Sequence, residues 1–244
     1  MVPYDKRETS LSARPKSIVI LTGAGISAES GIDTFRDAGG LWERHSVYDI
    51  ATPEGFARDP DLVLRFYDER RAGLAKVEPN AAHLALGRLE AEFAGDLLLV
   101  TQNVDDLHER GGFVDVCHMH GELRSALCTS CGTRSPWEGP MRDRPPCPVC
   151  KAPTLRPDVV WFGEMPYHMD RIEDALAACD LFVSIGTSGA VYPAAGFVSQ
   201  ARAMGTRTLE LNLEPSEGTA IFHQARHGAA SRLVPEWVEE VLKG

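Results

Sequence analysis

A strand-like run that ends in a glycine motif places the strongest constraint on how this chain can fold. The apolar residues 18–21 lead into Gly23-Ala-Gly25-Ile-Ser-Ala28, which has the form G-x-G-x-x-A. Gly23 permits a tight turn, Gly25 lets the backbone approach a pyrophosphate, and the N–H groups at the start of a following helix bind phosphate oxygens. Glycines after a strand also occur in plain turns, so a nucleotide site needs support from the rest of the chain.

The stretch after this motif departs from an ordinary dinucleotide-binding fold. Residues 32–41 are polar and glycine-rich where a Rossmann fold would place its second strand. We interpret this stretch as a long, mobile cover over the phosphate loop.

Apolar runs and helix signals alternate along the rest of the chain. Buried strands are expected at 17–22, 96–101, 114–119, 181–186 and 206–213. Helices are expected at about 60–76, after Asn80, at 169–178, from Pro193 and at 235–243, where the terminal helix follows a short apolar piece at 232–234. The alternation predicts an α/β fold with a Rossmann-like, doubly wound parallel sheet.

The expected domain division is a single domain with two inserted modules. A Rossmann-like lobe covers about 17–42, 79–121 and 155–244, with a helical insertion at about 43–78 and a zinc module at about 122–154. Residues 1–16 are expected to form a flexible N-terminus.

The charge balance limits the classes of partner. The 244 residues carry a formal net charge of −10, which argues against general binding to nucleic acid or to anionic membranes, but not against a basic peptide. No apolar run approaches the roughly 18 residues of a membrane span, and residues 1–16 lack the apolar segment of a signal peptide. We therefore expect a cytoplasmic protein. The sequence does not indicate its oligomeric state.

Four of the six cysteines have the spacing of a structural zinc site. Cys128-x-x-Cys131 and Cys147-x-x-Cys150 are separated by fifteen residues, and each pair can direct two thiolates at one ion. Two redox pairs are the alternative interpretation. Four protein ligands leave no open position for a substrate, so the metal is expected to be structural. Cys117 and Cys179 lie in apolar context and are expected to be buried and inert.

Polar residues follow four of the expected strands. They lie at 22–25, 101–105, 186–188 and 212–214, which a parallel sheet would bring to one edge. Simple polar loop ends explain each of these singly but not the four together, so we expect a dinucleotide crevice there. Glu214 is a candidate partner for a ribose hydroxyl, although it lies much farther from the glycine motif than the usual ~20 residues.

Histidines and one helix face offer further candidates for chemistry. His120, at a strand end before a glycine, is preferred over His118 as a general base. His83 fits a packed or surface position, and His108 fits either role. Tyr67 and Arg70 are spaced i, i+3 on one helix face, where they can bind a carboxylate or simply belong to a solvated surface.

Taken together, these residues resemble the sirtuins, the NAD-dependent protein-lysine deacylases, over nearly the whole chain. The matching motifs are Gly23-Ala-Gly-Ile-Ser27, Thr34-Phe-Arg36, Gln102-Asn-Val-Asp105, His120-Gly121, the four cysteines, Trp161-Phe-Gly-Glu164, Gly186-Thr-Ser188 and Asn212-Leu-Glu214. Thr52-Pro-Glu54, the Tyr67/Arg70 pair and Met119-His-Gly-Glu122 resemble the bacterial class III members, which remove acidic acyl groups such as succinyl as well as acetyl. Asp33 and Asp106 depart from the common pattern, and neither removes a catalytic group.

The resemblance implies a set of site residues. NAD would contact the glycine motif, the cover and the strand ends, at Gly23, Ala24, Gly25, Ser27, Ala28, Phe35, Arg36, Trp42, Gln102, Asn103, Val104, Asp105, Gly186, Thr187, Ser188, Asn212, Leu213, Glu214 and Ala230. His120 and Asn103 would be catalytic, with His120 as the base on a ribose hydroxyl. The acyl-lysine substrate would contact Tyr67, Arg70, Val160, Trp161, Phe162, Gly163 and Glu164, and Cys128, Cys131, Cys147 and Cys150 would hold one Zn²⁺.

The resemblance also implies the reaction and its partners. An acylated lysine of a protein or peptide would be freed as nicotinamide leaves, and the acyl group would end on ADP-ribose. The peptide backbone would add as a strand between residues 160–164 and the loop near 189–191. Two other classes of function stay open at this point: a hydride-transferring NAD dehydrogenase, and a zinc-stabilised binding module without catalysis.

Overall fold

The computed structural model describes residues 14–33 and 46–243 of the chain. Phe35, Arg36, Trp42, the greater part of the expected cover and residues 1–13 of the expected flexible N-terminus lie outside the described residues.

A six-stranded parallel sheet forms the centre of the larger lobe. Its order is β3-β2-β1-β7-β8-β9, and every neighbouring pair is parallel. The strands are β1 (Ser17–Thr22), β2 (Asp96–Thr101), β3 (Val116–His118), β7 (Leu181–Ile185), β8 (Arg207–Asn212) and β9 (Gln224–His227). The chain crosses from one half of the sheet to the other at β1, so the carboxyl ends of β1, β2 and β7 flank a topological switch point.

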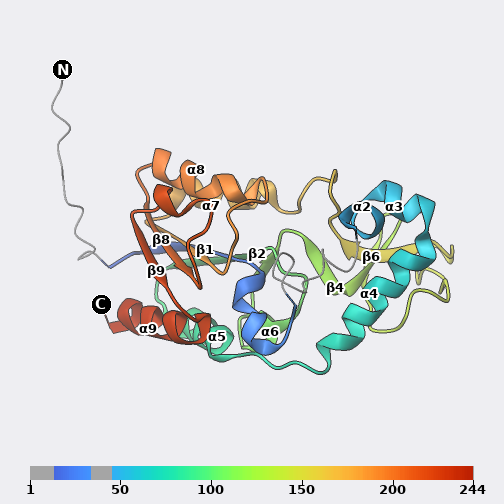
Figure 1. Cartoon of the computed structure of the whole chain (residues 1–244), viewed down its shortest axis with the longest axis horizontal. Coiled ribbons are helices and arrows are strands. Elements are labelled where there is room, and N and C mark those ends of the chain that lie inside the picture. The colour runs from blue at the N-terminus through green and yellow to red at the C-terminus, as the bar shows by residue number, and fades with distance from the viewer. Residues whose placement is uncertain (1–13, 34–45, 244) are drawn as a thin grey trace, which may run out of the picture.

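Helices cover both faces of this sheet, as Figure 1 shows. On one face α5 (Ala81–Glu92) and α9 (Ala230–Lys243) pack against Ile18 and Ile20 of β1. On the other face α7 (Met169–Ala178) and α8 (Phe197–Ala203) pack against Val19 and Leu21. Successive residues of β1 thus point to opposite faces and both sets are buried, which explains its unbroken apolar sequence.

A second, smaller lobe lies beside the carboxyl edge of the sheet. It contains the antiparallel sheet β5-β4-β6, made of β4 (Gly121–Cys128), β5 (Arg134–Pro136) and β6 (Leu155–Val159). Three helices, α2 (Val47–Ile50), α3 (Pro53–Arg58) and α4 (Pro60–Leu74), lie on the same side of the molecule in Figure 1. The short α6 (Leu107–Arg110) follows the carboxyl end of β2.

The predicted start of α4 is confirmed, and α3 starts in the same way. Thr52 caps α3 by accepting a hydrogen bond from the N–H of Gly55 at 2.9 Å, and Asp59 caps α4 by accepting one from Leu62 at 3.0 Å. Each helix has proline at its first position. An N–H group there would have no hydrogen-bond partner within the helix, so proline, which lacks this group, costs nothing.

The structure corrects the prediction at the C-terminus. Residues 232–234 are not a separate apolar piece, because α9 begins at Ala230 and carries Pro235 inside it. The buried residues Leu233, Val234, Trp237, Val238 and Val241 recur at helical spacing, so packing against the sheet outweighs the local cost of proline. The strand β9 was not expected, because Gln224–His227 is a polar edge strand with no apolar run.

Two further elements differ from the expected helices. The glycine motif opens two 3₁₀ turns, η1 (Ala24–Ile26) and η2 (Ala28–Ser30), instead of an α-helix. After Pro193 the chain makes the turn η3 (Ala194–Gly196) before α8 starts, and η4 (Thr219–Ile221) precedes β9.

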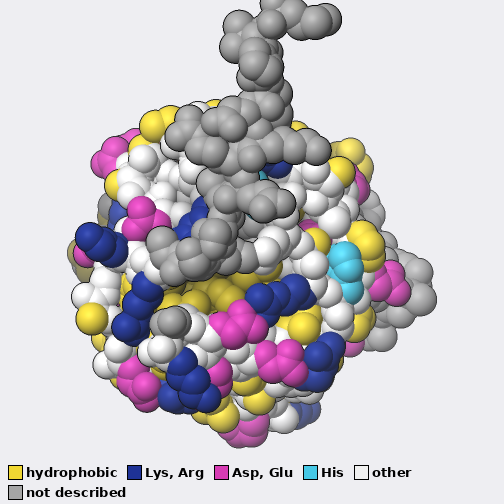
Figure 2. Space-filling model, turned by 90° about the vertical axis from the view of Figure 1, so that its left-hand side faces the viewer, with side chains coloured by type: hydrophobic (Ala, Val, Ile, Leu, Met, Phe, Trp, Pro, Cys, Tyr) yellow, Lys and Arg dark blue, Asp and Glu magenta, His cyan; other side chains and the backbone are white. Residues whose placement is uncertain are grey.

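The surface opposite the small sheet mixes the two signs of charge. Acidic and basic side chains are interspersed on the face in Figure 2, and α5, α9 and β9 at this end carry the ion pairs Arg88–Glu92 and Arg226–Glu240. In the described part of the chain no helix has the length and apolar character needed to cross a membrane.

Candidate active site

A cavity of about 720 Å³ lies where the strand ends face the smaller lobe. The strand-end residues in its lining are Gly23, Ala24, Gly25, Gln102, Asn103, Val104, Gly186, Thr187, Ser188, Asn212, Leu213 and Glu214. The same cavity is lined by Ala28, Tyr67, Arg70, His120 and residues 160–164. The structure therefore brings the four predicted strand ends together with the predicted base and the predicted substrate residues.

Two loops at the strand ends approach so closely that only glycine fits between them. The N–H of Gly25 donates to the carbonyl of Gly186 at 2.9 Å. A Cβ on Gly25 would lie 2.8 Å from the Cα of Gly186, and a Cβ on Gly186 would lie 2.4 Å from the N of Ile26. Gly186 also has a φ of +63°, which disfavours other residues. The floor of the cavity is thus bare backbone that can approach a phosphate.

A buried polar network lies behind this floor. The Asn103 amide donates to the carbonyl of Gly23 and to the hydroxyl of Ser27, each at 3.2 Å. The Ser27 hydroxyl in turn donates to Asp105 at 3.2 Å, and His83 Nε2 lies 3.3 Å from the same hydroxyl. Burial lowers the pKa of His83 to about 4, so its ring is neutral at pH 7. His83 is therefore a packed residue.

Ser27 and Asp105 belong to this network and do not line the cavity. Burial raises the pKa of Asp105, while the N–H of Leu107 and the Ser27 hydroxyl oppose that rise. The structure thus places both side chains one layer beneath the predicted cofactor contacts, where they fix the Asn103 amide. Ala230, at the start of α9, is also absent from the lining.

His120 faces the cavity with one ring nitrogen held from behind. Its Nδ1 lies 3.2 Å from the carbonyl of Gln102, so Nδ1–H can donate there and leave the lone pair of Nε2 free to accept a proton. Burial lowers the pKa of His120, which keeps the ring neutral at pH 7. A neutral imidazole at the cavity wall has the properties of a general base.

Tyr67 and Arg70 lie side by side at the end of the cavity formed by α4. The indole N–H of Trp161 donates to the Tyr67 hydroxyl at 3.0 Å, and the Arg70 guanidinium lies 5.7 Å from the ring centre of Phe66. Burial lowers the pKa of Arg70 and raises that of Tyr67. The Tyr67 hydroxyl, already an acceptor, can still donate, so the pair offers two kinds of donor to a carboxylate.

Residues 160–164 form one wall of the cavity, and hydrogen bonds to other residues of the chain hold part of this segment in place. The N–H of Val160 donates to the carbonyl of His120 at 2.9 Å. Glu164 accepts hydrogen bonds from the N–H of Trp161 and from Arg156, each at 2.9 Å. Phe162 is 52% exposed at the cavity rim. Val191, in the loop near 189–191 expected beside the substrate, also lines the cavity. The sequence did not single out the lining residues Phe66, Pro166, Tyr192, Ser216 and Glu217, because no spacing pattern marks them.

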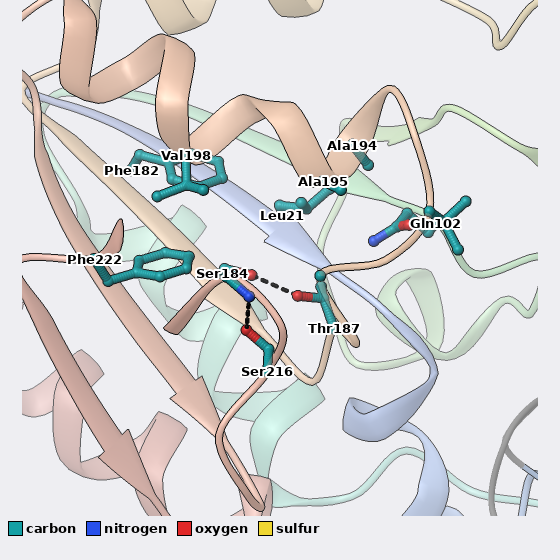
Figure 3. Close-up of a pocket in the computed structure, with 13 residues that line it drawn as sticks. Leu21, Gln102, Phe182, Ser184, Thr187, Ala194, Ala195, Val198, Ser216 and Phe222 are labelled. Atoms are coloured by element: carbon teal, nitrogen blue, oxygen red, sulfur yellow. Dashed lines mark hydrogen bonds between the residues drawn. The ribbon is translucent and has the colours of Figure 1, made fainter. Parts of the chain in front are cut away.

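A pocket of about 20 Å³ adjoins the cavity behind β7 (Figure 3). Gln102, Thr187, Val191 and Ser216 line both spaces. In Figure 3 the hydroxyls of Ser184 and Thr187 face each other, 2.8 Å apart. This space is large enough for about one water molecule.

The four predicted zinc ligands converge at the far end of the small sheet. The sulfurs of Cys128 and Cys150 are 3.6 Å apart, those of Cys131 and Cys147 are 3.8 Å apart, and all four lie within 4.8 Å of one another. Tetrahedral Zn²⁺ with bonds of about 2.3 Å requires sulfurs about 3.8 Å apart, so the cluster fits this ion. All four cysteines are free of disulfides, which contradicts an oxidised pair at either Cys-x-x-Cys.

Comparison with known proteins identifies the family. The Sir2 family profile matches residues 23–193. The chain belongs to the Sir2 family. It is 56% identical over 229 residues to an NAD-dependent protein deacylase of Caulobacter vibrioides, covering 92% of this chain and 96% of that protein. Its identity to the NAD-dependent protein deacylase of Salmonella typhi is 55% over 230 residues, covering 93% and 84%.

Solved Sir2 structures share this fold. A Sir2 homologue in complex with NAD matches this Sir2 chain with a TM-score of 0.86 at 40% identity, covering 94% of this chain and 90% of that one. A Sir2 protein with a deacetylated p53 peptide and 3′-O-acetyl ADP-ribose matches with a TM-score of 0.80 at 28% identity, covering 94% and 93%. The predicted fold class and family are therefore confirmed.

Proposed function

We propose that this Sir2 chain removes acyl groups from protein lysine side chains in an NAD-dependent reaction that yields nicotinamide, O-acyl-ADP-ribose and free lysine. The observation that carries the proposal is the single cavity that joins the glycine floor to His120 and to the α4 pair Tyr67/Arg70. The names of the curated relatives and the NAD complex of a Sir2 homologue support the same chemistry.

NAD would lie along the strand ends. The bare backbone at Gly23, Gly25 and Gly186 would face the pyrophosphate, and Asn212 and Glu214 would face the adenosine end. The nicotinamide end would lie against Asn103, whose amide is fixed by Ser27 and Gly23. Phe35, Arg36 and Trp42 stay predicted contacts, since they lie outside the described residues.

His120 would act as the general base on a ribose hydroxyl. The bond between its Nδ1 and the carbonyl of Gln102 holds the ring in the tautomer with a free Nε2. The low pKa that burial gives His120 keeps this form populated at neutral pH. Asn103, which also lines the cavity, would position the reacting end of NAD.

The acyl-lysine would enter between the lobes. Its backbone would add beside residues 160–164 and the loop near Val191, where main-chain contacts give affinity with little dependence on sequence. Its acyl group would then point at Tyr67 and Arg70, so acidic acyl groups such as succinyl are accepted together with acetyl. Acylated proteins or peptides are therefore the proposed partners.

The test is a pair of deacylation rates on one peptide that carries either acetyl-lysine or succinyl-lysine. Zinc-loaded wild type should release nicotinamide and deacylate both peptides with NAD, without forming NADH. His120→Tyr should lose activity on both by about 10²-fold or more, the usual contribution of a general base. A folded, zinc-loaded wild type that acts on neither peptide would overturn the proposal.

A further inference from the structure

His118, two residues before His120, contacts the loop that carries Asn103 from the side away from the cavity. His118 ends β3, is 7% exposed and does not line the cavity. Its Nδ1 lies 3.2 Å from the carbonyl of Asn103. His120 contacts the preceding carbonyl, that of Gln102, in the same way. Two histidines spaced i, i+2 thus hold consecutive peptide groups of the loop that carries Asn103 and Asp105.

The two histidines differ at their other ring nitrogen. His120 Nε2 faces the cavity, whereas His118 Nε2 lies 2.6 Å from a carboxylate oxygen of Glu109 on α6. A carboxylate of Glu122 on β4 lies 4.0 Å from the same nitrogen. Both nitrogens of His118 therefore face acceptor oxygens, and only the imidazolium, with two N–H groups, satisfies both at once.

We propose that His118 is a positioning residue for the deacylation reaction: clamped as an imidazolium by Glu109 and Glu122, it fixes the Asn103 carbonyl and thereby the Asn103 amide and Asp105. This inference rests on the proposed function for the roles of Asn103 and Asp105. His118 touches neither the cavity nor the reacting groups, so it acts through the loop alone.

The charges around His118 favour its protonated form. Burial alone would lower the pKa of His118, but the hydrogen bond and charge of Glu109 and the charge of Glu122 outweigh it and raise the pKa. Asp105, on the loop after β2, is a further neighbour that interacts with the charge of His118, and His108 on α6 also lies close to it. His108 is neutral at pH 7, since burial lowers its pKa far below the usual value.

The sign of the pH dependence follows from this direction. A raised folded-state pKa means that the clamp is complete below the ordinary histidine pKa and is lost as the pH rises through the raised value. Above that value the remaining ring proton stays on Nε2, which donates to the Glu109 carboxylate, so Nδ1 carries a lone pair that faces the Asn103 carbonyl and the two repel. The loop is then expected to loosen on the alkaline side.

Two substitutions separate the two bonds of His118. The amide nitrogen of Asn matches the position of Nδ1, and that of Gln matches Nε2. We expect His118→Gln to lower kcat/KM for NAD about tenfold and to change nicotinamide inhibition, because the bond to Asn103 is lost. His118→Asn should stay within about threefold of wild type. The control is Glu240→Gln: Glu240 lies on α9 and pairs with Arg226 of β9, away from the cavity, so this variant should keep the activity of wild type.

A structural role alone predicts a different result. In that case both variants would lower the unfolding temperature together, with equal effects on the KM for NAD and the KM for the peptide. Equal activity of His118→Gln and wild type would also overturn the proposal. If wild type itself does not deacylate, the proposed function fails. A second measurement, which needs no activity, still tests the contacts of His118 with Glu109 and Asn103.

That second measurement is an NMR titration of the full zinc-loaded chain with ¹⁵N-labelled histidine and backbone. His118 should titrate above 6.5, its ordinary value, and Glu109→Gln should lower that midpoint. The amide of Val104, which follows the Asn103 carbonyl, should shift with the same midpoint. A midpoint at or below 6.5 with an unresponsive Val104 amide would show that His118 is not the clamp.

Discussion

At the scale of single residues, α4 presents a neutral donor and a cation to the same region of the cavity. Trp161 fixes the Tyr67 hydroxyl as an acceptor, so the remaining O–H is directed at whatever fills the cavity. Arg70 lies one helical turn further, with its side chain half-buried. A hydrogen bond to a charged group contributes about 1.5–3 kcal/mol, which is enough to decide between acyl groups of similar size.

The double variant Arg70→Met with Tyr67→Phe is therefore expected to lose desuccinylation by at least about tenfold more than deacetylation. The succinyl carboxylate would lose both donors, whereas an acetyl group has no charge to pair. Paired rates on the two peptides measure this ratio. Arg65→Met, at an exposed position of the same helix, should leave the ratio unchanged. An equal loss on both substrates would mean that the pair is structural.

Single residues also show where sequence reasoning succeeds. Gly23, Gly25 and the four cysteines are predictable because their spacing alone determines a turn or a ligand set. The contact of His83 with Ser27 joins positions 56 residues apart, and the one between His118 and Glu109 depends on how α6 follows β2. No local pattern encodes such contacts, so their partners become visible only in the folded chain.

At the scale of elements, the caps decide where α4 starts and so where Tyr67 and Arg70 lie. Asp59 accepts the N–H of Leu62, and Pro60 supplies the first helical position. We expect Asp59→Ala to lower the free energy of unfolding by about 1 kcal/mol, the usual value of such a cap. Denaturant unfolding measures it, and Asp59→Asn, which keeps an acceptor, should lose much less. A loss that is the same for both variants would contradict the capping role.

Two errors of sequence reasoning, the absence of β9 and the late start given to the terminal helix α9, have a common physical cause. β9 is an exposed edge strand whose pairing with β8 comes from the backbone, so its side chains show no apolar period. α9 contains Pro235, a residue that ordinarily marks a helix boundary, and its burial against the sheet overrides that signal. Buried strands were predictable because both of their faces must be apolar, whereas these two elements depend on tertiary contacts.

At the scale of the whole molecule, α4, the helix that carries Tyr67 and Arg70, is hydrogen-bonded to the zinc module. Arg71 of α4 donates to the carbonyl of Leu123 at 2.6 Å and pairs with Asp68 at 2.8 Å. Asp68 in turn accepts the N–H groups of Met141 and Arg142, in the segment between the two cysteine pairs. The zinc cluster does not line the cavity, but it fixes both ends of the segment whose N–H groups bind Asp68 of α4.

Removal of Zn²⁺ should therefore act on substrate selection through α4. After chelation, or in Cys131→Ser, the unfolding temperature should fall, and the KM for a succinylated peptide should rise before NAD binding is lost. The reason is that Tyr67 and Arg70 move with α4, whereas the glycine floor belongs to the large sheet. Thermal unfolding, metal content and the two KM values on partly depleted protein measure this order. Simultaneous loss of both substrates at every level of depletion would mean that the two lobes unfold as one unit.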